Sequence, residues 1–183
     1  SDNADILIFV PPVFEFKKYV EHTEDTLNKA VFNSIDFFTK ELNTILPCMQ
    51  KNIYGRIIPL IYDYVDVSVP YVSAFGLYSG AISALTKNIA MEYAKYNIRA
   101  NCVMMGLSVG EQTDFWNQEI SSNCDLVDCQ PVKRCGTAED VANAVLFLAS
   151  EMSSFISAEN IPLNGGANVI GHNQVWTDWL KKI

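Results

Sequence analysis

Short apolar runs typical of buried strands alternate with helical segments along most of this chain. Four runs stand out: Ile6–Val10, Arg56–Ile58, Ile98–Val103 and Asn160–Leu163. A strand that is apolar along its whole length is buried on both faces, as in a parallel sheet. Strand–helix alternation predicts a parallel sheet covered by helices. The sequence therefore predicts an α/β fold with a doubly wound parallel sheet in a single domain, residues 1–183.

Three segments between these runs have helical periodicity. The first begins at Thr23, an N-cap residue followed by two acids. Its apolar positions recur up to Pro47: Leu27, Val31, Ile35, Phe38, Leu42 and Ile45. The second follows Phe75, with the stripe Ala81, Leu85, Ile89 and Tyr93. The third opens at a capping box from Thr137 to Asp140. Residues 107–135 are less regular and predict a lid or loop region.

Charge and cysteine content exclude several classes of protein. The net charge of −8 argues against nucleic acid or an anionic membrane as the main partner. The five cysteines are odd in number and lack CxxC spacing, so a disulfide framework or a zinc site is not expected. His22 and His172 are too few for a histidine-rich metal site. These features predict a cytoplasmic protein without a bound metal.

The segment Phe75–Gly106 closely resembles the active-site helix and following strand of the short-chain dehydrogenase/reductase family. Five segments, one of them within Phe75–Gly106, resemble family motifs in the family's order: Asp5–Ile8, Tyr54–Ile58, Asn97–Asn101, Arg134–Ala142 and Ile161–Gly166. The chain is therefore identified as a member of this family, and the resemblance implies the C-terminal part of a Rossmann-like fold. Relatives are dinucleotide-dependent oxidoreductases that form dimers and tetramers.

The positions that carry chemistry in the family differ here. The resemblance places the catalytic tyrosine at Phe75, the lysine at Ser79 and the serine at Tyr62. Proton transfer needs an ionisable group, and Phe75 has none. The run Phe9-Val-Pro-Pro12 replaces the small residues that let backbone lie close to the cofactor. The family's asparagine falls on Asn33, or on Ser34 in a neighbouring register.

The resemblance also starts at the family's fourth strand, so the glycine-rich turn that binds the pyrophosphate is not matched. Gly76-x-x-x-Gly80 and Gly106-x-x-x-Gly110 do not follow a first strand. We interpret the first pair as close helix packing. We therefore expect a truncated sheet, with no catalytic, cofactor-binding or metal-binding residue. On this interpretation the chain is not an enzyme by itself and binds no cofactor, and NAD is held by a partner subunit.

Other candidate groups have structural interpretations. Tyr78 has no lysine four residues on and favours a structural or interface role. Tyr62-Asp63-Tyr64 could form a new acid–base site but is more typical of surface, as is His172. Cys124 and Cys129 lack an adjacent basic residue that would lower a thiol pKa. Arg99 and Asn101 favour hydrogen bonds that stabilise the fold.

The leading functional hypothesis is a non-catalytic partner subunit of a hetero-oligomeric short-chain dehydrogenase that stabilises an active paralogue. The elements that relatives use for assembly match residues 23–46, 74–94, 138–150 and 160–166. The tail, residues 171–183, could dock Trp176 and Trp179 on a partner. A narrower resemblance is to heteromeric hydroxyacyl-CoA dehydrogenases of the benzylsuccinate type. The alternatives are a ligand-sensing or regulatory module with a pocket near 107–135, and an enzyme with rebuilt chemistry at Tyr62, Asp63 or Tyr78.

Overall fold

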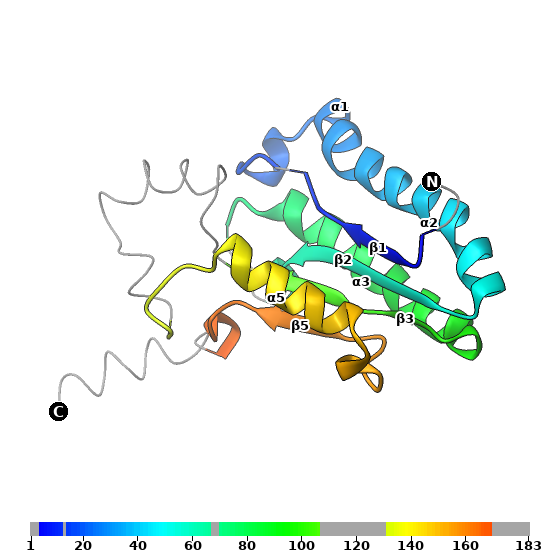
Figure 1. The fold of residues 1–183 in the computed structure, drawn as a ribbon. Coiled ribbons are helices and arrows are strands. Elements are labelled where there is room, and N and C mark those ends of the chain that lie inside the picture. Colours follow the sequence, from blue (N-terminus) through cyan, green and yellow to red (C-terminus); the bar gives the residue numbers. More distant parts are fainter. Residues whose placement is uncertain (1–3, 13, 67–69, 107–130, 170–183) are drawn as a thin grey trace.

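The computed structural model describes residues 4–12, 14–66, 70–106 and 131–169. Its centre is a five-stranded parallel sheet in the order β1-β2-β4-β5, with β3 also paired to β2 (Figure 1). The strands are β1 (Ile6–Phe9), β2 (Gly55–Tyr62), β3 (Ile98–Ala100), β4 (Cys102–Met105) and β5 (Asn160–Leu163). Every pairing is parallel, as the apolar runs predict. The predicted α/β class is confirmed.

Helices cover both faces of this sheet. On one face lie α2 (Asn33–Asn52) and α3 (Ser73–Tyr93), and on the other lies α5 (Ala138–Ala149) (Figure 1). The larger core joins α2 and α3 to β1 and β2 through residues such as Phe38, Ile57 and Ile82. A smaller core joins α5 to the sheet through Val145, Leu148 and Ile58. The alternation of buried side chains along β2 therefore serves two separate cores.

Strand β2 is longer than its sequence predicts because it runs through Pro59. Proline lacks the N–H that a central strand donates to its neighbour. On that side of β2 the neighbouring chain is interrupted at Asn101, between β3 and β4. The side chain of Asn101 instead donates to the carbonyl of Ile156 and accepts from the N–H of Glu159. Pro59 therefore lies at the point where the pairing of β2 with its neighbour is interrupted, between β3 and β4.

The first helical segment is less regular than its periodicity suggests. A short α1 (Glu24–Leu27) begins at the predicted N-cap Thr23, and a π-helical turn (Asn28–Phe32) connects it to α2. Helix α2 continues past Pro47 to Asn52, and its C-cap residue Ile53 has a φ of 51°. A β-branched residue in the left-handed region is strained, and glycine is the usual residue at such a helix end.

Other parts of the prediction fall outside the described residues. Most of the proposed lid, residues 107–130, lies there, and so does the tail, residues 171–183. Among the helices that the structure describes, none is long and apolar enough to cross a membrane.

Candidate functional site

The positions that carry function in the family lie at the carboxyl ends of β1 and β2 and in the first turns of α3. Strand β1 pairs with β2 only as far as Phe9, opposite Pro59. Pro11 and Pro12 follow and have no N–H to extend the pairing. Strand β2 continues to Tyr62, so its last backbone groups on this side extend beyond β1. Buried backbone groups need partners, and another element must supply them here.

Helix α3 supplies these partners through two side chains. The hydroxyl of Tyr78 donates to the carbonyl of Leu60 at 3.2 Å, and the hydroxyl of Ser79 accepts from the N–H of Tyr62 at 2.9 Å. Tyr78 and Ser79 are both 0% exposed. The hydroxyl of Tyr62 in turn donates to the carbonyl of Pro12 at 3.0 Å. The Ser79 side chain therefore links α3 to β2 through its hydrogen bond with the Tyr62 N–H.

Six aromatic rings, which we call the Phe75 cluster, fill the space beside these bonds. Its members are Phe14, Phe16, Tyr62, Tyr64, Phe75 and Tyr78. The Phe75 ring centroid lies 4.4 Å from that of Phe16 and 4.9 Å from that of Tyr62. Phe75 is only 1% exposed. A packed aromatic core thus occupies the position of the family's catalytic tyrosine.

Two phenols of this cluster, those of Tyr64 and Tyr78, stay protonated at neutral pH. Burial raises the pKa of Tyr64 to about 12, with the neighbouring Asp63 adding to the shift. Burial also raises the pKa of Tyr78, to a greater extent. Neither phenol therefore has the lowered pKa that a lysine neighbour gives the family's tyrosine. The interpretation of Tyr78 as structural agrees with its bond to β2.

A nicotinamide cofactor does not fit at positions 75 and 79. In the family the lysine ammonium binds the nicotinamide ribose, whereas Ser79 brings no charge and its hydroxyl already bonds to Tyr62. Phe75 offers no hydrogen-bonding group. At these two positions the chain departs from the family's chemistry.

A second polar group lies at the carboxyl ends of β2, β4 and β5. Asp63 directly follows β2 and is 8% exposed, while Asn164 directly follows β5 and is 6% exposed. The Asn164 amide nitrogen donates to a carboxyl oxygen of Asp63 at 3.5 Å. Gly106, just after β4, packs directly against Asn164. A side chain at position 106 would not fit, because its Cβ would lie 2.5 Å from the Asn164 Cβ. The expectation of a surface position for Asp63 and Tyr62 is wrong, because both are buried.

Burial also changes the acidity of Asp63. It raises the pKa of this carboxyl from 3.8 to about 6, against the opposing effect of the Asn164 hydrogen bond. The nearby charge of Asp66 adds to the rise. A carboxyl group with a pKa near neutrality can exchange a proton under physiological conditions, which is the property that general acid–base catalysis needs. Sequence reasoning considered Asp63 but had no signal for its burial.

Replacing Asp63 with asparagine is expected to stabilise the protein above pH 6. The folded state disfavours the charged carboxylate, so its ionisation lowers the free energy of unfolding as pH rises from 3.8 to about 6. A shift of about two units corresponds to at most about 3 kcal/mol. Urea unfolding at pH 7.5 should show the gain, and at pH 4 it should vanish. The exposed control Asp66→Asn should change little; equal effects of the two variants would contradict the assignment.

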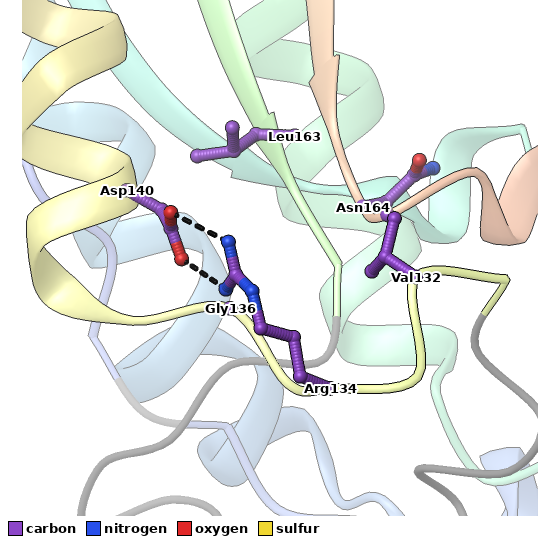
Figure 2. A pocket seen from close by; sticks show the side chains of 7 residues that line it. Val132, Arg134, Gly136, Asp140, Leu163 and Asn164 are labelled. Atoms are coloured by element: carbon purple, nitrogen blue, oxygen red, sulfur yellow. Dashed lines mark hydrogen bonds and ion pairs between the residues drawn. The ribbon is translucent and has the colours of Figure 1, made fainter.

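A pocket of about 150 Å³ opens beside the same strand ends (Figure 2). Its lining residues are Val132, Arg134, Gly136, Asp140, Leu163, Asn164 and Gly165. Arg134 forms two hydrogen bonds with Asp140, at 2.6 and 3.0 Å, and holds the pKa of that carboxyl well below its usual range. Asp140 also accepts from the N–H of Thr137, which confirms the predicted capping box at the start of α5. The pocket therefore combines apolar walls with one ion pair.

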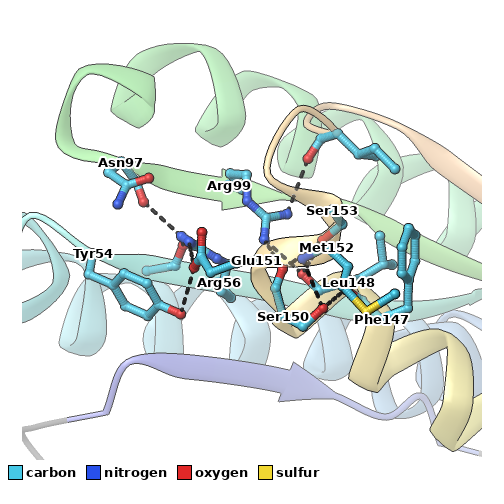
Figure 3. Close-up of polar contacts among 12 residues, drawn as sticks. Tyr54, Arg56, Asn97, Arg99, Phe147, Leu148, Ser150, Glu151, Met152 and Ser153 are labelled. Atoms are coloured by element: carbon cyan, nitrogen blue, oxygen red, sulfur yellow. Dashed lines mark hydrogen bonds and ion pairs between the residues drawn. The ribbon is translucent and has the colours of Figure 1, made fainter.

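Two buried arginines brace the opposite end of the sheet (Figure 3). Arg56 on β2 lies beside Arg99 on β3 in the strand register. Arg56 bonds to Glu151 at 2.8 Å, and Arg99 donates to the carbonyls of Leu148 and Ser150 at the end of α5. A cation at a helix C-terminus is favourable. Arg99 and Asn101 thus stabilise the fold, as predicted.

The remaining candidates do not join the site. Asn33 is exposed at the start of α2. No close contact explains the glycines of α3, since a Cβ at Gly76 would be 3.7 Å from its nearest neighbour and one at Gly80 would meet none within 4 Å. Gly110, Cys124, Cys129 and His172 lie outside the described residues. Within the described ranges no cluster of His, Cys, Asp and Glu could hold a metal ion.

Comparison with known proteins gives matches over most of the chain. The model of the enoyl-(acyl carrier protein) reductase family matches residues 4–168. "Putative oxidoreductase YtkK" of Bacillus subtilis (strain 168) is 31% identical over 90% of this chain and 65% of its own length. The 2,3-dihydroxy-2,3-dihydro-p-cumate dehydrogenase of Pseudomonas putida is 28% identical over 84% of this chain and 60% of its own length. The chain thus spans less than two thirds of these relatives.

Solved structures confirm the fold. YwfH, an NADPH dependent reductase involved in bacilysin biosynthesis, has a TM-score of 0.83 at 22% identity and covers 90% of this chain and 67% of its own. Levodione reductase has a TM-score of 0.84 at 21% identity, covering 91% and 66%.

These matches overturn two expectations from the sequence. The chain was expected not to be an enzyme by itself, but the matched family and relatives are oxidoreductases. It was also expected to bind no cofactor, whereas the matched family is one of reductases and the solved structure YwfH is named as an NADPH dependent reductase. Both expectations are wrong: they rested on positions 75 and 79 and the unmatched glycine-rich turn alone. With its parallel sheet, its ordered motifs and these matches, the chain belongs to the short-chain dehydrogenase/reductase family.

Proposed function

We propose that this chain is one subunit of a hetero-oligomeric short-chain oxidoreductase, in which it associates with and stabilises an active paralogue. The observation that carries the proposal is the outer surface of α3. The proposal includes a cytoplasmic location, and it includes the view that the described sheet corresponds to the C-terminal part of a longer family sheet. The greater length of the matched relatives supports that view.

The exposed surface of α3 has the pattern of a helix–helix contact. Five side chains recur at alternating intervals of four and three residues: Leu77, Ala81, Ala84, Asn88 and Met91. We call this row the α3 seam. Leu77 is 44% exposed and Met91 74% exposed, although both are apolar. Intervals of four and three place residues on one face of a helix, as in packed helix pairs.

Small side chains at the centre of the seam would let a second helix approach closely. Ala81 and Ala84 lie there, and a Cβ at the neighbouring Gly80 would have no atom within 4 Å. On α2, Phe37 is 55% exposed and adds apolar surface to the same face of the sheet. Exposed apolar surface on a helix, such as the α3 seam presents, is typical of protein–protein contacts. The proposal names the enzyme family and no substrate, since no contact among the described residues recognises a coenzyme A ester.

Native mass spectrometry tests the partnership. The chain is co-expressed with family members encoded beside it, and we expect a stable hetero-oligomer. Ala84→Glu should weaken the complex about tenfold or more, because it places a charge in an apolar helix contact. Lys87→Glu places the same side chain on the same helix outside the seam and should have little effect. A stable monomer that binds no family member would sink the proposal.

A second candidate function is ligand sensing or regulation, and the pocket in Figure 2 favours it. Val132 and Leu163 would contact an apolar group, while Arg134 and Asp140 would orient a polar one. Isothermal titration calorimetry with a series of acyl-CoAs tests this role. Binding that Leu163→Arg abolishes would support it, and the absence of heat with every member of the series would reject it.

A further inference from the structure

In the pocket of Figure 2, the guanidinium of Arg134 keeps two N–H donors that have no partner among the described residues. Its Nη1 donates to Asp140 at 2.6 Å and to the carbonyl of Cys135 at 3.0 Å, and its Nη2 donates to Asp140 at 3.0 Å. A guanidinium has five N–H donors in a planar fork. The two that remain, on Nε and Nη2, lie on one edge of the group and point in nearly parallel directions.

The other polar side chains that line the pocket already have partners. Both carboxyl oxygens of Asp140 accept from Arg134, and Oδ2 also accepts from the N–H and the hydroxyl of Thr137. Asn164 is paired through both the nitrogen and the oxygen of its amide. Arg134 is therefore the lining side chain that remains able to recognise a polar ligand.

We infer that this pocket binds a small aliphatic carboxylate, whose two oxygens accept from the Nε–H and Nη2–H of Arg134. Arginine binds carboxylates through two parallel N–H···O bonds, because its planar fork matches the spacing of the two oxygens. Val132 and Leu163 form apolar walls that would contact the alkyl chain. The inference rests on the ligand-sensing role described above, for which it names the class of ligand.

The size of the pocket limits the ligand to a few carbon atoms. Its volume is about 150 Å³, whereas pockets for drug-sized molecules take about 300–1,000 Å³. A thioester such as an acyl-CoA has a single carbonyl oxygen and cannot accept from both N–H groups of the free edge. Figure 2 shows the guanidinium between Asp140 and Val132, so a carboxylate on the edge away from Asp140 would lie inside the pocket.

The pocket is separate from the positions at which the family carries out its chemistry. Leu163 packs against the smaller core beneath α5, whereas Tyr62, Phe75 and Tyr78 belong to the larger core beneath α2 and α3. A carboxylate bound by Arg134 would therefore lie on the α5 side of the sheet and would not contact the Phe75 cluster.

Asp140 provides a test in which binding should become tighter. Its hydrogen bonds with Arg134 hold the pKa of its carboxyl well below the usual range, so the group stays charged and repels a second carboxylate on the same guanidinium. Asp140→Asn removes this charge but keeps an oxygen that can accept from the Thr137 N–H. We expect this variant to bind butanoate about three- to tenfold more tightly than the parent chain. Weaker binding by a variant that circular dichroism shows to be folded would overturn the inference.

Isothermal titration calorimetry of the full chain compares butanoate with the neutral butanamide, which has the same size. We expect butanoate to bind with a millimolar dissociation constant and butanamide at least about tenfold more weakly. Arg134→Lys keeps the positive charge but lacks the planar fork, and it should weaken butanoate binding about tenfold. The matched control is Lys133→Gln, which removes an exposed neighbouring cation that does not line the pocket and should change the dissociation constant less than about twofold.

Two results would contradict the carboxylate site directly: equal binding of butanoate and butanamide, or no heat from butanoate at about 10 mM. Binding of an acyl-CoA without binding of butanoate would also overturn the inference, while the ligand-sensing role would stand. The hetero-oligomer is measured separately by native mass spectrometry, so the failure of one proposal can be told apart from the failure of the other.

Discussion

Replacing Ser79 with lysine, the residue that the family has at this position, is expected to destabilise the protein by more than about 3 kcal/mol. The Ser79 side chain is 0% exposed, and its hydroxyl is the acceptor for the Tyr62 N–H. Lysine has no acceptor, so that N–H would lose its partner. The longer side chain must also enter a filled core and bury an ammonium group. The total stability of a domain is only about 5–15 kcal/mol.

Urea unfolding followed by circular dichroism measures this effect, and two controls separate its causes. Ser79→Ala removes only the hydrogen bond and should cost about 1–2 kcal/mol. Ala84→Lys places the same lysine at an exposed position of α3 and should change the free energy of unfolding by less than about 0.5 kcal/mol. If Ser79→Lys unfolds at the urea concentration of Ala84→Lys, position 79 faces an open site and the described packing is wrong.

The sequence predicts the sheet well because most residues of its strands are apolar. The bounds of β5 agree with the predicted run Asn160–Leu163, and β1 differs from its predicted run by one residue. The extension of β2 through Pro59 could not be predicted, because it depends on the interruption of the neighbouring chain at Asn101. A local pattern carries no information about the partner strand.

The candidate site could likewise be predicted only in part, because its side chains come from segments that are far apart in the sequence. The changes at positions 75 and 79 are visible in the sequence, but their consequence depends on Phe14 and Phe16, which reach the site from the segment after β1. The burial of Asp63 depends on Asn164, 101 residues away along the chain. Loss of the family's tyrosine and lysine therefore led to the wrong expectation of a chain without enzyme function or cofactor. The polar pair at the strand ends became evident only from the fold.

Replacing Phe75 with alanine is expected to cost about 3–5 kcal/mol, the usual range for a large aromatic side chain in a core. The ring has neighbours on several sides, with centroids at 5.3 Å for Phe14 and 5.5 Å for Tyr64. Each aromatic pair adds about 0.5–1.5 kcal/mol beyond the burial of apolar area. For a protein of this size, thermal unfolding should shift downward by roughly 10 °C. The matched control is Phe37→Ala on α2, where the ring is 55% exposed and the loss should stay below about 1 kcal/mol. Equal shifts for the two variants would mean that Phe75 faces an open cleft and that the described packing of the Phe75 cluster is wrong.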